Sequence, residues 1–140
     1  SGGYISGLAV KTFVTSSSAT IPYDVVSALI LCDGSSRDIY ITLPTMFTYD
    51  DGHVLKIKRM GGGFPIPNIM AGKSYHLIDG EEKLVDSYIE YDGGYQTTGG
   101  RSFAMRKNEV MEFVYYKWLS NEVDGAIRYG CWVQTSRTTY

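Results

Sequence analysis

The sequence is poor in several residue types that would point to particular classes of protein. Of its 140 residues, four are proline, two are cysteine and two are histidine. So few cysteines exclude a disulfide-rich scaffold, and there is no CxxC pair or cluster of histidines for a structural zinc. No apolar run approaches the roughly 20 residues that span a bilayer. We therefore expect no metal, no cofactor and no insertion into a membrane.

The sequence also has no large excess of charge of either sign. Thirteen Lys and Arg stand against fifteen Asp and Glu, which gives a net charge of −2. Because nucleic-acid binding proteins carry a basic excess, a nucleic acid is not an expected partner. Cys32 and Cys131 each lie in an apolar run, which is typical of buried free thiols, with a single disulfide as the alternative.

What the chain does contain is twelve tyrosines and sixteen glycines. Tyrosine favours strands and glycine favours turns and bulges, so the composition predicts an all-β domain. The length predicts one domain over residues 1–140. Within it, we expect residues 1–8 to be a tag remnant or a linker. Residues 93–108 are polar and glycine-rich, and we expect them to form a long loop.

Short apolar or alternating runs separated by turn signals recur along the chain. The run over 53–60 places Leu55 and Ile57 on one face and Lys56 and Lys58 on the other, as a half-buried strand does. Other predicted strands cover residues 9–14, 25–32, 39–43, 74–78, 83–90, 110–119 and 126–134. This spacing predicts an antiparallel β-sandwich or jelly roll. The expected core residues are Val10, Ile30, Ile41, Leu55, Ile57, Val114 and Val133.

The motifs for catalysis are incomplete. Gly72-Lys73-Ser74 matches the second half of a phosphate-binding loop, but the first glycine would fall at Pro67, which has no N–H to offer. His53 and His76 stand alone, and no GxSxG elbow is present. We expect no enzymatic activity and name no catalytic residue. A Ser–His–Asp group assembled only in space is the open alternative.

The acidic groups have two interpretations. They could serve sugar hydrolysis or calcium binding, or they could simply cap turns beside glycine. The residues in question are Asp50, Asp51, Asp79, Glu81, Glu82 and Asp92.

Aromatic side chains form the more informative set. Tyr88, Tyr91 and Tyr95 lead into the predicted long loop, where exposed rings would stack on sugars, so we regard them as candidate carbohydrate-binding residues. A second group falls late in the chain and is expected to pack in the core or at a subunit interface. It consists of Tyr115, Tyr116, Trp118, Tyr129 and Trp132.

One extended pattern, over residues 25–134, resembles a known family. It consists of Ile41-Thr42-Leu43-Pro44, Asp51-Gly52, the run His53-Val54-Leu55-Lys56-Ile57-Lys58-Arg59, Leu77-Ile78-Asp79-Gly80, a hydrophobic strand over 111–118, Gly125-Ala126-Ile127 and a final Trp132-Val133. In this order the motifs resemble the small β domains at the distal ends of bacteriophage tail fibres, tailspikes and neck appendages.

The resemblance implies a homotrimeric β-sandwich or jelly roll in the tail appendage of a virion. Its role there would be to hold the trimer together, to contact bacterial surface polysaccharide, or both. Two alternatives stand beside it: a lectin-like carbohydrate-binding module of a polysaccharide-degrading protein, and a hydrolase fragment.

Overall fold

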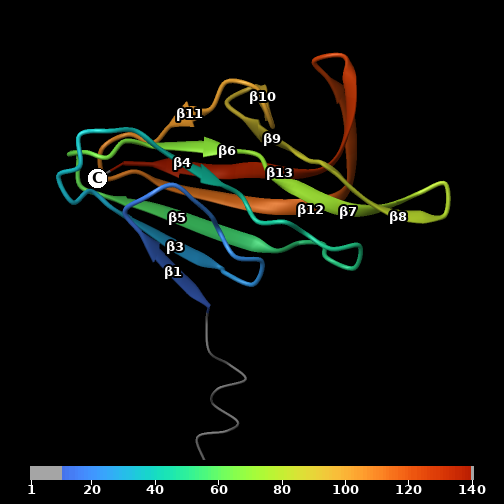
Figure 1. Ribbon diagram of the computed structural model, residues 1–140, viewed down its shortest axis with the longest axis horizontal. Helices are drawn as coiled ribbons and strands as arrows, with labels where there is room; N and C mark the ends of the chain where they lie inside the picture. The colour runs from blue at the N-terminus through green and yellow to red at the C-terminus, as the bar shows by residue number, and fades with distance from the viewer. Residues whose placement is uncertain (1–10, 140) are drawn as a thin grey trace, which may run out of the picture.

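The structure, a computed structural model, describes residues 11–139, and that stretch consists of strands and loops without a helix (Figure 1). The all-β prediction is thus confirmed. Helices able to cross a bilayer are accordingly not found in these residues. The strands are β1 Thr12–Thr15, β2 Ala19–Thr20, β3 Ser27–Leu31, β4 Ile39–Thr42, β5 Val54–Met60, β6 Pro67–Met70, β7 Lys73–Ile78, β8 Glu81–Asp86, β9 Tyr88–Tyr91, β10 Gly94–Thr97, β11 Phe103–Ala104, β12 Val110–Val123 and β13 Ala126–Thr138.

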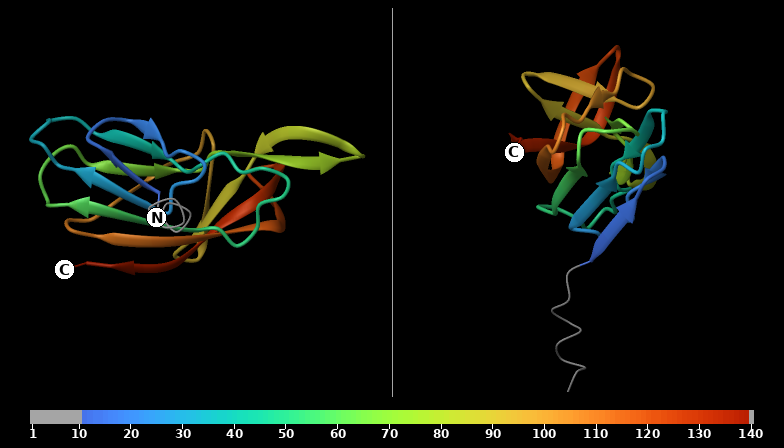
Figure 2. Two further views of the ribbon diagram at one scale, coloured as in Figure 1. Left: turned by 90° about the horizontal axis from the view of Figure 1, so that it is seen from below. Right: turned by 90° about the vertical axis from the view of Figure 1, so that its left-hand side faces the viewer.

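Two sheets make up the body of the molecule, as expected for a β-sandwich. The larger has seven strands in the order β1-β3-β5-β12-β13-β9-β10, and the smaller has four in the order β11-β6-β4-β2. Strands β7 and β8 form a separate hairpin that projects from one end of the body (Figures 1 and 2). The far end of the long β12–β13 hairpin also turns away from its sheet (Figure 1).

The antiparallel part of the fold prediction is wrong for the first half of the chain, and also for the pair of β9 with β13, which is parallel. From β1 to β6 the chain passes from one sheet to the other at every step, so the next strand in the same sheet runs in the same direction. Thr12 pairs in parallel with Ser27, and Ser27 with Lys56. In the smaller sheet β2, β4 and β6 are also parallel. Antiparallel pairing holds for the β7–β8, β9–β10 and β12–β13 hairpins, and for β12 against β5.

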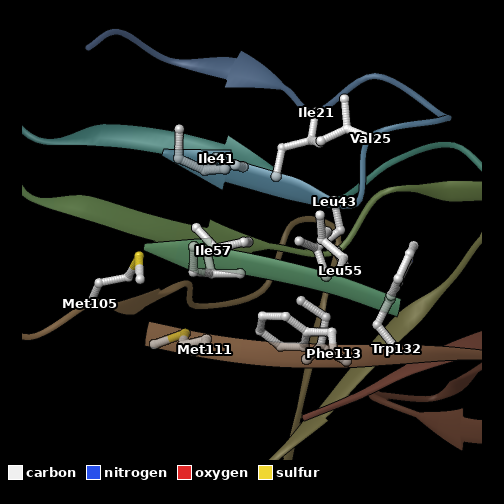
Figure 3. Close-up of a cluster of buried hydrophobic side chains, with 14 of the residues drawn as sticks. Ile21, Val25, Ile41, Leu43, Leu55, Ile57, Met105, Met111, Phe113 and Trp132 are labelled. Carbon is white, nitrogen blue, oxygen red and sulfur yellow. The ribbon is translucent and has the colours of Figure 1, made fainter. Parts of the chain in front are cut away.

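The space between the two sheets is filled by one hydrophobic core (Figure 3). Four of the predicted core residues, Ile30, Ile41, Leu55 and Ile57, are fully buried in it. Burying such a side chain contributes about 1.5–3 kcal/mol, so this layer supplies most of the stabilisation. Val10, the first predicted core residue, lies outside the described residues.

The core prediction is wrong for the remaining two residues, Val114 and Val133, which do not point into the core. Val114 and Val133 are only half-buried, because Phe113, Tyr115 and Trp132 beside them take the inward positions. Strand side chains alternate between faces, so the two valines lie on the outer face of the seven-stranded sheet.

The predicted long loop over residues 93–108 is also wrong. It contains β10, which pairs with β9, and β11, which pairs with β6. Gln96 looks like a loop residue by type but is buried, where its side chain accepts a hydrogen bond from the Ala71 N–H (2.5 Å) and donates one to the Thr97 carbonyl (2.7 Å).

Asp-Gly turns close three of the hairpins. At each of them the aspartate and the glycine both have positive φ, as a two-residue type I′ turn requires. These pairs are Asp79 (φ 51°) with Gly80 (79°), Asp92 (45°) with Gly93 (77°), and Asp124 (53°) with Gly125 (79°).

Both cysteines are free thiols. Cys131 is buried, whereas Cys32 is half-buried just after β3 and donates to the Pro65 carbonyl at 3.6 Å. The prediction of buried free thiols is thus confirmed for Cys131, and Cys32 is more accessible than expected.

Candidate functional site

A large bulge interrupts the β12–β13 hairpin. Tyr116 pairs with Cys131 and Ser120 pairs with Tyr129, so residues 117–119 stand opposite Gly130 alone. Gly130 has a φ of 80°, and a Cβ there would come within 2.3 Å of the Tyr115 hydroxyl. A glycine inside a strand pattern is a typical sign of such a bulge. The bulge bends the hairpin and re-aims the side chains of residues 117–119.

The bulge is fastened to the loop between β4 and β5. The Lys117 N–H donates to Asp51 Oδ1 at 3.0 Å, and its ammonium group donates to the Thr48 carbonyl. The Gly52 N–H donates to the Tyr115 carbonyl at 2.7 Å. As a result, Trp118 stands on an anchored backbone with its large ring facing outward, 79% exposed. The Lys117 ammonium lies 4.5 Å from the centroid of that ring.

A small pocket of about 100 Å³ lies beside Trp118 and joins the bulge to the β7–β8 hairpin. Its lining consists of Thr48, His76, Leu77, Lys117 and Trp118. Burial, together with the charge of Lys117, lowers the pKa of His76 below its ordinary value. The neutral ring places Nε2 at 3.3 Å from the Tyr115 hydroxyl. The pocket thus combines two apolar walls with a hydroxyl, an imidazole and an ammonium group.

An aromatic stack continues from the same loop. The ring of Phe47 is parallel to those of Tyr49 (centroids 5.8 Å apart) and Tyr75 (5.4 Å), and Tyr23 meets it edge-on at 4.8 Å. The Tyr23 hydroxyl donates to Asp50 at 2.9 Å. The stack fixes the loop that anchors the bulge, and it leaves the Tyr49 side chain exposed.

The outer face of the seven-stranded sheet is unusually apolar. Register places Val54, Val114 and Val133 side by side across β5, β12 and β13. A second cross-strand row contains Val14 and Leu29. Val54, at 41% exposed, and Val14 are open to solvent although the outer face of a sandwich normally carries polar side chains. Between the rows, Lys56 and Glu112 form an ion pair at 3.7 Å.

The three tyrosines predicted to bind carbohydrate do not share one surface. Tyr88 is buried against Val123 and Cys131, and its ring meets that of Tyr95 edge-on at 5.5 Å. Tyr91 lies on the opposite face of β9, stacked on Phe103 with the ring centroids 3.9 Å apart. Of the three, only Tyr95 offers an exposed ring.

The late aromatic residues divide between the core and the surface. Tyr115 and Trp132 are fully buried, with centroids 5.2 Å apart, whereas Tyr129 is half-buried beside His76. Tyr116 and Trp118 are exposed. Their place at an interface stays a prediction.

Known proteins give no further guide. No family model, curated protein or solved structure matches this chain. The functional argument therefore rests on its own residues.

Several of the remaining sequence candidates have structural partners. Lys73 opens β7 and pairs with Asp86 at 2.8 Å, as a surface lysine in a hairpin does. Asp50 accepts hydrogen bonds from the Phe47 N–H and Tyr23, and Asp92 pairs with Arg137 at 2.9 Å. Within residues 11–139, no three His, Cys, Asp or Glu side chains come together as a metal site would need.

Sequence reasoning missed the residues around Trp118. Thr48, Leu77 and Lys117 come from three distant segments and carry no motif. Gly130 was the available signal, because a glycine between Tyr129 and Cys131 interrupts an otherwise continuous strand pattern.

Proposed function

We propose that this chain is a non-enzymatic module at the distal end of a bacteriophage tail fibre, tailspike or neck appendage, where it holds the fibre together as a homotrimer. Contact with the host surface is its second role. The motif order over residues 25–134 supports the family, and the outer face of the seven-stranded sheet supports self-association.

The observation that carries the proposal is the row formed by Val54, Val114 and Val133. Aromatic side chains on the inner face of β12 and β13 and valines on the outer face give the sheet more apolar surface than one sandwich hides. Three copies that turn this face toward a common axis would cover it, and closed symmetry would stop further growth. Lys56 and Glu112, of opposite charge on the same face, can pair between copies as well as within one.

The mass of the protein in solution tests this directly. We expect light scattering to give about three times 15.6 kDa at micromolar concentration. Val54→Lys should yield a monomer, because burying an unpaired ammonium in an apolar interface is costly. Tyr40→Lys is the matched control: Tyr40 is 48% exposed on the other sheet and should leave the trimer intact. A wild-type monomer would contradict the proposal.

A lectin-like module is the second candidate, and the exposed rings of Tyr95 and Trp118 favour it. If the exposed ring of Tyr95 contributes to the glycan contact, replacing it by Ala should weaken adsorption to host polysaccharide without changing the mass. Unchanged adsorption would place the contact elsewhere on the molecule.

A further inference from the structure

We propose that Trp118 and the pocket beside it form a binding site for an uncharged saccharide. This inference rests on the second role proposed above, contact with the host surface, and it places that contact on the bulge of β12 rather than on the tyrosines of β9 and β10.

The first support is an exposed ring on an anchored backbone. Sugars stack on aromatic rings through their apolar C–H faces, and a backbone segment that is already fixed loses little entropy on binding. Trp118 follows Lys117, whose backbone and ammonium groups are both bonded to the β4–β5 loop. Its ring is still 79% exposed although Lys117 lies against it, so most of the ring is open for stacking.

The second support is the set of polar groups beside the ring. The Thr48 hydroxyl lies in the pocket and donates to Glu82 Oε2 at 3.3 Å, which brings a carboxylate to the rim. His76 directs Nε2 to the Tyr115 hydroxyl at 3.3 Å. Hydroxyl, carboxylate and neutral imidazole are groups that exchange hydrogen bonds with sugar hydroxyls.

The size of the pocket limits what enters it. At about 100 Å³ it is smaller than the roughly 300–1,000 Å³ of a pocket that encloses a small molecule. It has room for one edge of a sugar ring, while the rest of the ring would lie on Trp118. The site therefore suits one unit of a surface-bound chain and does not suit an enclosed ligand.

The charges around the pocket balance. Lys117 lines it and Lys83 pairs with His76 across the β7–β8 hairpin, while Asp51 accepts from the Lys117 N–H and Glu82 accepts from Thr48. With two cations and two carboxylates beside it, the pocket has no excess positive charge to hold a sulfated or carboxylated glycan, so an uncharged unit suits it better.

The test is binding of the whole chain to an array of bacterial polysaccharides sorted into uncharged and anionic sets. We expect binding to members of the uncharged set, at least a tenfold loss for Trp118→Ala, and partial retention for Trp118→Phe, which keeps a smaller ring. Tyr40→Ala is the control for removing an exposed ring and should bind as the wild type does.

Light scattering on the same samples separates this inference from the proposed trimer. Trp118→Ala should keep the wild-type mass, so a site failure and an assembly failure give different readings. Binding confined to anionic glycans, no binding to any glycan, or equal binding by Trp118→Ala would each overturn the site. A fall in mass for Trp118→Ala would also overturn it, because Trp118 would then belong to the subunit interface.

Discussion

Arg137 donates to a fully buried carboxylate: its Nε lies 2.5 Å from Oε2 of Glu109. A second nitrogen reaches Oε1 at 3.1 Å, and a third contact goes to Asp92 at 2.9 Å. Glu109 also accepts a hydrogen bond from the Arg106 N–H at 2.8 Å. This group ties the end of β13 to the turn that precedes β12.

Removing the arginine should therefore be severe. Arg137→Ala leaves the Glu109 charge buried without its partner, and we expect a loss of about 3–5 kcal/mol in the free energy of unfolding. Urea denaturation followed by fluorescence measures it. Arg101→Ala, at an exposed position, should change stability by less than about 0.5 kcal/mol. The double variant Glu109→Gln/Arg137→Met should recover much of the loss, and an equally unstable double variant would contradict the buried-charge explanation.

The bulge at Gly130 makes a second prediction. Gly130→Ala places a Cβ at 2.3 Å from the Tyr115 hydroxyl on a backbone with a φ of 80°, so we expect a loss of about 2–5 kcal/mol from the strained backbone and the displaced ring. Gly125→Ala is the matched control, because its φ of 79° is nearly the same and nothing lies within 4 Å. It should lose about 1–2 kcal/mol from the backbone alone.

Thermal unfolding of these variants should also show coupling to Tyr115. Adding Tyr115→Phe to Gly130→Ala removes the nearest atom and should recover part of the loss. If Gly125→Ala and Gly130→Ala proved equally unstable, the contact with Tyr115 would not be the cause.

Local signals predicted the parts of this fold that depend on local geometry. The Asp79-Gly80 turn and the alternation of Leu55 and Ile57 were readable because turn chemistry and side-chain period are properties of neighbouring residues. The direction of pairing is not such a property. β1 is parallel to β3 only because the chain visits the other sheet at β2, a strand of two residues that no pattern marks.

The candidate surfaces show the same division. Val114 and Val133 are as apolar as core residues, so hydrophobicity alone could not tell the outer face from the inner one. Trp118 could be named as a core or interface residue from its type. Its exposure, however, depends on the bulge in which residues 117–119 stand opposite Gly130. That bulge can be recognised only once the pairing of β12 with β13 is known.

The pH dependence of stability should carry a contribution from His76. Its pKa is lowered by burial and by Lys117, so the unfolded chain binds this proton more readily than the folded one. The contribution of neutral His76 to the free energy of unfolding is therefore fully present above its ordinary pKa of 6.5. It is lost as the pH falls toward the lowered pKa of the folded state. His76→Gln should lose less stability than the wild type between about pH 7 and pH 5 in urea titrations. Parallel curves for the two proteins would contradict the assignment.

The two cysteines should differ in reactivity. Burial raises the pKa of Cys131 to about 12, and the thiolate is the reactive form, so Cys131 should resist alkylation in the folded protein. Cys32 is half-buried in a loop-end position and free of a disulfide. Iodoacetamide at about pH 8, followed by peptide mass spectrometry, should label Cys32 first and reach Cys131 only after denaturant is added. Labelling of both at the same rate in the native state would mean that the cluster of Tyr88, Val123 and Cys131 opens readily.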